Sequence, residues 1–140
     1  MHTLFKIGNV PIYVDINKTK TFYLPQMSIA ENCSCESCIY FSEIFSQLSL
    51  PIFIVLKDMG VDLKKNVENE PTGVFTVLDD TNDGVFYVEQ MFYVYGYIGP
   101  HLIEDLEHTR VEDGYSVRTS LDTISEMENV VRIWTEITRL

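Results

Sequence analysis

The sequence lacks an apolar run approaching the roughly 20 residues that a membrane-spanning helix needs. Its longest apolar stretches are residues 51–56 and 91–99. The first residues show no charged leader followed by a long apolar segment, so we expect no secretory signal. These absences predict a cytoplasmic protein that makes no membrane contact.

Basic residues are also few, with 10 Lys and Arg against 21 Asp and Glu and a formal charge of −11. The imbalance lies in residues 31–140, because residues 1–30 carry Lys6, Lys18 and Lys20 against Asp15. Such a surface repels the phosphates of nucleic acids, so we expect no nucleic-acid partner. A protein partner, if there is one, is expected to be basic, although net charge also maintains solubility.

Signatures of common enzymes and cofactor sites are missing as well. The sequence has no G-x-S-x-G nucleophile elbow and no Gly-rich phosphate loop. The cluster of Asp79, Asp80 and Asp83 lacks the spaced carboxylates of a calcium-binding EF-hand. We therefore assign no catalytic residue and no residue that binds an organic cofactor.

Length and composition predict one domain spanning residues 1–140. With 46% hydrophobic residues, the chain can bury enough apolar surface to fold. The order of apolar patterns predicts an α+β fold, in which a mostly antiparallel β-sheet packs against two short helices from the middle third.

The N-terminal third reads as a β-hairpin. Residues 5–16 contain Ile12 and Val14 in alternation, and residues 20–25 are predicted to form the second strand after a turn at Asn17. Gly8 and Pro11 favour an irregular or edge strand.

Two helices are predicted next. The first begins near Ser34 or Cys35, capped by Asn32 or Ser34, because Cys38, Phe41, Phe45 and Leu48 recur at helical spacing. The second is signalled by Pro51 at its first position and Gly60 at its end. Its apolar face comprises Ile52, Val55, Leu56 and Met59.

The second half is predicted to be mainly strands. Residues 73–80 and 84–99 form a hairpin whose long second strand carries large residues on both faces, so both faces should be covered. Residues 100–114 read as an acidic loop or short exposed helix, and 115–121 as a strand. Residues 121–140 fit either pattern; β-branched residues favour a short helix at 121–127 and then a closing strand.

All three cysteines lie within six residues, as Cys33, Cys35 and Cys38. A C-x-C-x-x-C sequence can supply three thiolates to a tetrahedral zinc ion, but the chain lacks the second C-x-x-C pair of a typical zinc site. A fourth ligand would have to be His101, His108 or His2, with Glu31 or Glu36 as alternatives. Zinc is therefore one candidate cofactor.

Two other roles for the cysteines stay open. A helix N-terminus stabilises a thiolate, so Cys35 and Cys38 could act as a redox pair, although Glu36 would oppose the thiolate. Alternatively all three are structural thiols, and Cys38 shares its helical face with Phe41 and Phe45.

Residues 33–65 resemble a group of small uncharacterised bacterial proteins. Their pattern is C-x-C-x-x-C followed by a helix that ends in a G-[IV]-D-x-x-K segment, here Gly60, Val61, Asp62 and Lys65. Tyr40 stands where those proteins have Asn. The resemblance implies an α+β domain with a mostly antiparallel sheet, and it implies no activity.

The sequence thus predicts a non-enzymatic, acidic, cytosolic binding or interaction protein. The alternative is a zinc-binding or thiol-redox protein that uses the cysteine cluster. Tyr87, Tyr93, Tyr95 and Tyr97 alternate along one predicted strand and could line an interface, including that of a homodimer.

Overall fold

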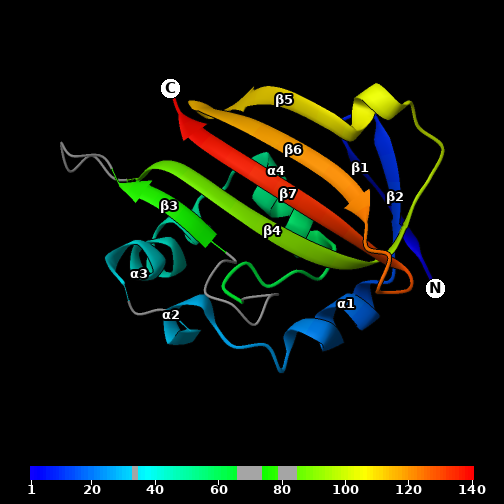
Figure 1. Cartoon of the computed structure of the whole chain (residues 1–140), viewed down its shortest axis with the longest axis horizontal. Coiled ribbons are helices and arrows are strands. Elements are labelled where there is room, and N and C mark those ends of the chain that lie inside the picture. Colours follow the sequence, from blue (N-terminus) through cyan, green and yellow to red (C-terminus); the bar gives the residue numbers. More distant parts are fainter. Residues whose placement is uncertain (33–34, 66–73, 79–84) are drawn as a thin grey trace.

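The computed structural model spans residues 1–140 and describes residues 1–32, 35–65, 74–78 and 85–140 (Figure 1). The described residues form one antiparallel β-sheet with short helices packed against it, which confirms the predicted α+β fold. The strands are β1 (Thr3–Ile7), β2 (Val10–Val14), β3 (Val74–Leu78), β4 (Val85–Ile98), β5 (Glu107–Glu112), β6 (Tyr115–Thr123) and β7 (Val130–Arg139). The helices are α1 (Ile16–Tyr23), α2 (Ile29–Asn32), α3 (Glu36–Glu43) and α4 (Pro51–Asp58), with 3₁₀ turns η1 (Phe45–Gln47) and η2 (Ile103–Leu106).

Strand β4 organises the sheet, whose order is β1-β2-β4-β7-β6-β5. Residues 87–95 of β4 pair with β7 along one edge. The opposite edge of β4 is shared, because β3 pairs with its first half and β2 with its last residues. The β3–β4 pairing confirms the predicted hairpin, whose turn at residues 79–84 lies outside the described residues.

Helix α1 occupies the part of this edge that lies between β3 and β2. The Tyr23 hydroxyl donates to the Tyr93 carbonyl (2.8 Å) and accepts from the Tyr93 N–H (3.0 Å). The Thr19 hydroxyl accepts from the Tyr95 N–H (3.0 Å), and the Asp15 N–H donates to the Tyr95 carbonyl (2.8 Å). Helix α1 and its N-cap therefore satisfy backbone groups of β4 that lie between the residues paired with β3 and those paired with β2.

The predicted N-terminal hairpin is wrong in its position. The chain turns at Gly8, where φ is +59°, and β1 pairs with β2 before the predicted turn at Asn17. Residues 20–25 belong mostly to α1, because Asp15 caps this helix by accepting from the Lys18 N–H (3.0 Å). Helices α1 and α2 were not expected from the sequence.

The two expected helices are α3 and α4. Helix α4 begins at Pro51 and ends in a Schellman motif, in which the Gly60 N–H bonds the Lys57 carbonyl and the Val61 N–H bonds the Leu56 carbonyl (3.0 Å each). Gly60 takes φ +100°, as predicted. Helix α3 starts later than expected, since Cys35 is its N-cap in place of Asn32 or Ser34.

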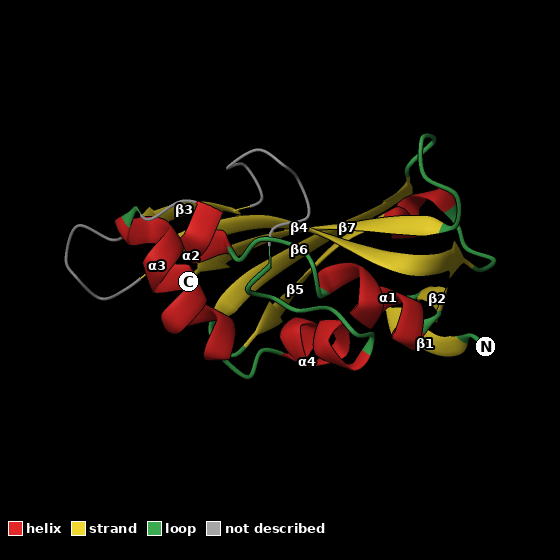
Figure 2. Cartoon of the chain, turned by 90° about the horizontal axis from the view of Figure 1, so that it is seen from below, coloured by secondary structure: helices red, strands yellow, loops and turns green. Residues whose placement is uncertain are grey.

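The core lies between one face of the sheet and the helices, with α4 behind the sheet in Figure 1 and below β4, β6 and β7 in the turned view of Figure 2. On β4 the even-numbered positions from Val88 to Val94 face this core, as the alternation predicted. The other face of β4 is covered in part. Met91 and Tyr93 are buried by Phe22, Ile124 and Met127, whereas Tyr97 is 48% exposed.

Two predictions for the C-terminal half are wrong, and two are confirmed. Residues 100–114 contain the strand β5 as well as the short turn η2, so they are not mainly loop. Residues 121–127 form no helix: β6 continues to Thr123, and a turn at 124–129 follows. Strand β6 contains the predicted strand at 115–121, and β7 is the predicted closing strand. Pairing with β6 over nine positions outweighs the helical spacing of its apolar residues.

Candidate functional site

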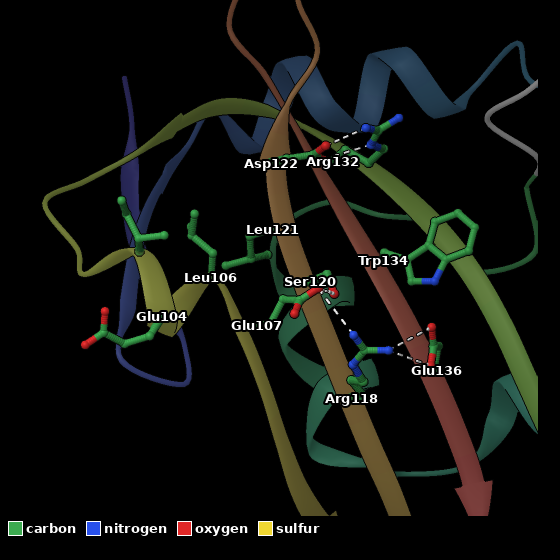
Figure 3. Close-up of a pocket in the computed structure, with 11 residues that line it drawn as sticks. Glu104, Leu106, Glu107, Arg118, Ser120, Leu121, Asp122, Arg132, Trp134 and Glu136 are labelled. Carbon is green, nitrogen blue, oxygen red and sulfur yellow. Dashed lines mark hydrogen bonds and ion pairs between the residues drawn. The ribbon is translucent and has the colours of Figure 1, made fainter.

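A groove runs across the sheet from η2 to β7, on the side opposite α4, with a volume of about 710 Å³ (Figure 3). Turn η2 and β5 form one wall, and β6 and β7 form the floor. The lining residues are Ile103, Glu104, Leu106, Glu107, Arg118, Ser120, Leu121, Asp122, Arg132, Trp134 and Glu136.

Strand alternation and register bring the floor of this groove together. Positions 118, 120 and 122 of β6 share a face, and positions 132, 134 and 136 of β7 lie opposite them. The pairs are Arg118 with Glu136, Ser120 with Trp134, and Asp122 with Arg132. These cross-strand partners are 10 to 18 positions apart in the sequence.

Arg118 lies between two carboxylates. Its Nη1 donates to the Glu136 carboxylate (3.2 and 3.4 Å), and its Nη2 donates to Glu107 Oε1 (3.3 Å). Ser120 donates to the same Glu107 oxygen (3.3 Å). Glu136, and then Glu107, raise the pKa of the Arg118 guanidinium. The side chains of Arg118 and Glu107 are 45% and 62% exposed, so solvent and a partner can reach them.

Arg132 is held differently. Its Nε donates to Asp122 Oδ1 (2.8 Å) and its Nη2 to Asp122 Oδ2, so one carboxylate takes both arms of the guanidinium. Such two-armed pairs have the best-defined geometry of arginine contacts. Arg132 and Asp122 therefore form a bidentate ion pair at the end of the groove nearest the turn at 124–129.

Trp134 is the only tryptophan in the chain and lies in the middle of this floor. Its ring is half-buried against the cluster that contains Met91 and Tyr93. Figure 3 shows the indole projecting from β7 on the side of β4, away from Ser120, with Arg132 before it and Glu136 after it along the strand. A large aromatic surface next to water and charged groups is common where proteins bind other molecules.

The groove is acidic on balance. Glu104, Glu107, Asp122 and Glu136 line it together with two arginines. Both arginines are already paired with three of these carboxylates, so two negative charges are in formal excess. Beside the groove, Tyr87 donates to Glu89 (2.9 Å), and burial followed by this contact raises the pKa of Tyr87 to about 12.

The predicted cysteine site lies elsewhere, at the start of α3. Cys35 is exposed, and its Sγ accepts from the Cys38 N–H (3.4 Å). Cys38 is buried with Phe41 in the core, as its helical position predicted. Cys33 lies outside the described residues. Among the residues that the structure describes, no group of three or more His, Cys, Asp or Glu is placed to hold a metal ion.

The three histidines proposed as a fourth ligand contact other parts of the molecule. His2 packs on Tyr97, with ring centroids 5.3 Å apart, and His101 Nδ1 lies 2.8 Å from the Gly99 carbonyl. His108 bonds the Thr119 hydroxyl (2.9 Å). The structure thus brings none of them to Cys35 or Cys38, and the zinc site remains a prediction.

Sequence reasoning named some groove residues only as part of an acidic loop and did not recognise Arg118, Arg132 or Trp134 as a site. A weak signal was present, because polar and apolar residues alternate in 115–121 and place Arg118 on the outer face of that strand. The partner strand and its register were not readable from the sequence.

Comparisons of the chain with protein-family models, with curated proteins and with solved structures found no match. Within the described residues no single helix has the length and apolar composition needed to cross a membrane, and only the bent pair 38–47 and 51–58 passes that test jointly.

Proposed function

We propose that this chain is a non-enzymatic binding protein that takes a basic segment of a protein partner into the groove between η2 and β7. The observation that carries the proposal is the combination of an excess of carboxylates with a half-buried Trp134 on the groove floor. The carboxylates attract cationic side chains, and the indole offers them an apolar and cation–π surface.

The charge of the whole chain supports the same choice of partner. A formal charge of −11 speeds encounter with a basic protein and disfavours nucleic acids and anionic membrane surfaces. The cytoplasm is the proposed location. The groove is built entirely within one chain, so a homodimer is not needed to complete it.

The test is binding of a fluorescein-labelled hexa-arginine peptide, followed by anisotropy at about 150 mM salt, where long-range attraction is screened. Reversing two groove charges, Glu104→Lys with Glu107→Lys, should weaken binding about tenfold. The control reverses two exposed carboxylates at helix C-termini, Glu43→Lys with Asp58→Lys. Lysine is favourable at a helix C-terminus, so the control should fold normally.

The two variants have the same net charge, which separates the groove from the overall field of the protein. The proposal is supported if the groove variant binds the peptide more weakly while the affinity of the control variant stays within about threefold of the wild-type value. Equal weakening in both variants would mean that net charge alone attracts the peptide, and the proposal would be wrong.

One observation favours a thiol function as the second candidate. Cys35 is exposed at the N-cap of α3, where the Cys38 N–H already points at its sulfur. Zinc analysis of protein purified without chelator, combined with thiol titration, tests this candidate. About one zinc per chain with a protected Cys35 thiol supports a metal site, and metal-free protein in which Cys35 reacts at the ordinary rate of an exposed thiol excludes both a metal site and an activated Cys35.

A further inference from the structure

Of the two arginines in the groove, Arg118 has the longer contacts to its carboxylate partners. Its three contacts to Glu107 and Glu136 measure 3.2 to 3.4 Å, whereas Arg132 makes a two-armed contact to the single carboxylate of Asp122. The carboxylates of Glu107 and Glu136 come from β5 and β7, on the two sides of β6. They hold Arg118 from both sides, as the dashed lines in Figure 3 show.

We propose that Glu107 and Glu136 form the place where an arginine of the partner binds, and that Arg118 fills this place in the free chain as an internal competitor. This inference rests on the proposed function, because it concerns the same groove and the same basic partner. It adds the chemical class of the recognised group, a guanidinium, and a residue that sets the affinity.

The geometry of the pair selects a guanidinium. The two carboxylates are reached by different nitrogens of one planar group, Nη1 for Glu136 and Nη2 for Glu107. A guanidinium offers such separated, fixed donors, whereas a lysine ammonium is a compact point charge. Trp134, two residues before Glu136 on the same face of β7, can stack on the flat group from the partner.

The exposure of these groups makes exchange feasible. Arg118, Glu107 and Glu136 are 45%, 62% and 27% exposed, and ion pairs that remain in contact with water contribute little to stability. A partner arginine can nevertheless bind only when Arg118 has left. The observed affinity is therefore the intrinsic affinity multiplied by the fraction of molecules in which the place is empty. Removing Arg118 should therefore increase the affinity.

The experiment compares Arg118→Gln with wild-type protein, using labelled hexa-arginine and hexa-lysine peptides. Arg118→Gln should bind hexa-arginine about threefold to tenfold more tightly, and hexa-lysine should gain less. Lys57→Gln is the matched control, since it removes one positive charge from an exposed position at the far end of α4 and should change the affinity less than twofold. A thermal melt of each variant checks that a gain in affinity does not come from loss of folding.

A second variant locates the effect. Adding Glu136→Gln to Arg118→Gln should cancel the gain, because the vacated place then lacks one of its two carboxylates. If Arg118→Gln binds hexa-arginine no better than Lys57→Gln does, or if hexa-lysine gains as much as hexa-arginine, the inference is wrong. It is also wrong if the gain survives Glu136→Gln.

These outcomes separate the inference from the proposed function. Wild-type binding in the groove without a gain in Arg118→Gln overturns the inference alone. Binding by Arg118→Gln but not by the wild-type chain supports the inference and means that the free chain is closed to this peptide. Absence of binding in both proteins overturns the inference together with the proposed function.

Discussion

The carboxylate of Glu112 in β5 caps helix α4 by accepting a hydrogen bond from the Ile52 N–H at 3.1 Å, across 60 positions of sequence. The N-cap residue of α4, Leu50, has no side-chain acceptor. Pro51, the first residue of the helix, has no N–H that needs a partner. Glu112 also pairs with Arg110 and is 5% exposed. This hydrogen bond connects the edge strand β5 to helix α4, which packs in the core.

Replacing Glu112 by alanine should destabilise the protein by about 1–3 kcal/mol, because the Ile52 N–H stays buried without an acceptor. Glu112→Gln keeps a carbonyl oxygen and should cost less than the alanine variant. Urea unfolding measures both variants, with Glu126→Ala at an exposed turn as the control expected within about 0.5 kcal/mol. Equal stability of Glu112→Ala and Glu126→Ala would contradict the capping role.

The Tyr23 hydroxyl should be equally important for the edge of β4. It serves both the N–H and the carbonyl of Tyr93, and burial raises its pKa, so the hydroxyl keeps its proton. Tyr23→Phe should lower the free energy of unfolding by about 1–3 kcal/mol, since two buried backbone groups lose their partner. Tyr97→Phe removes a hydroxyl from a ring that is 48% exposed and serves as the control. A loss no larger than that of the control would show that water or another group replaces the Tyr23 hydroxyl.

His108 makes stability depend on pH. Its ring packs against Gly8, where an added Cβ would lie 2.8 Å from the imidazole, and its Nε2 has no hydrogen-bond partner among the described residues. Burial, and then the charge of Arg110, lower the pKa of His108 below its ordinary value of 6.5, against smaller opposing effects of Glu112 and Asp105. The folded state therefore favours the neutral ring.

It follows that the unfolded chain takes up a proton near pH 6.5 while the folded chain resists it. The stability contributed by neutral His108 is complete above this pH and is lost as the pH falls below it. Urea unfolding at several pH values between about 7.5 and 5 should show a smaller decline for His108→Gln than for the wild-type chain. Parallel declines in both proteins would rule out His108 as the group responsible.

Local sequence signals predicted α4 in detail. Pro51 and Gly60 act through their own backbone restrictions, and the apolar spacing between them needs no knowledge of the rest of the fold. Helix α1 had comparable signals, since Asp15 precedes it and Thr19 and Tyr23 lie one turn apart. The aromatic and β-branched content of residues 20–25 outweighed these signals and led to a wrong prediction of a strand.

The groove was beyond local prediction for a different reason. Arg118, Glu107 and Glu136 meet only because β5, β6 and β7 pair in one particular register. A shift of one residue in either pairing would send these side chains to opposite faces. The register is set by the apolar residues on the core side, such as Val117, Ile133 and Ile137, and not by the charged residues that it brings together.

Binding of a basic segment in the groove around Trp134 can be observed at the indole N–H resonance of Trp134 during a titration with hexa-arginine. The chain has one tryptophan, so this signal reports on the groove alone. If the peptide occupies the groove, this resonance should shift progressively and saturably, with the same midpoint as the anisotropy titration. Anisotropy that shows binding while the indole resonance stays in place would mean that the peptide binds elsewhere and would contradict the account.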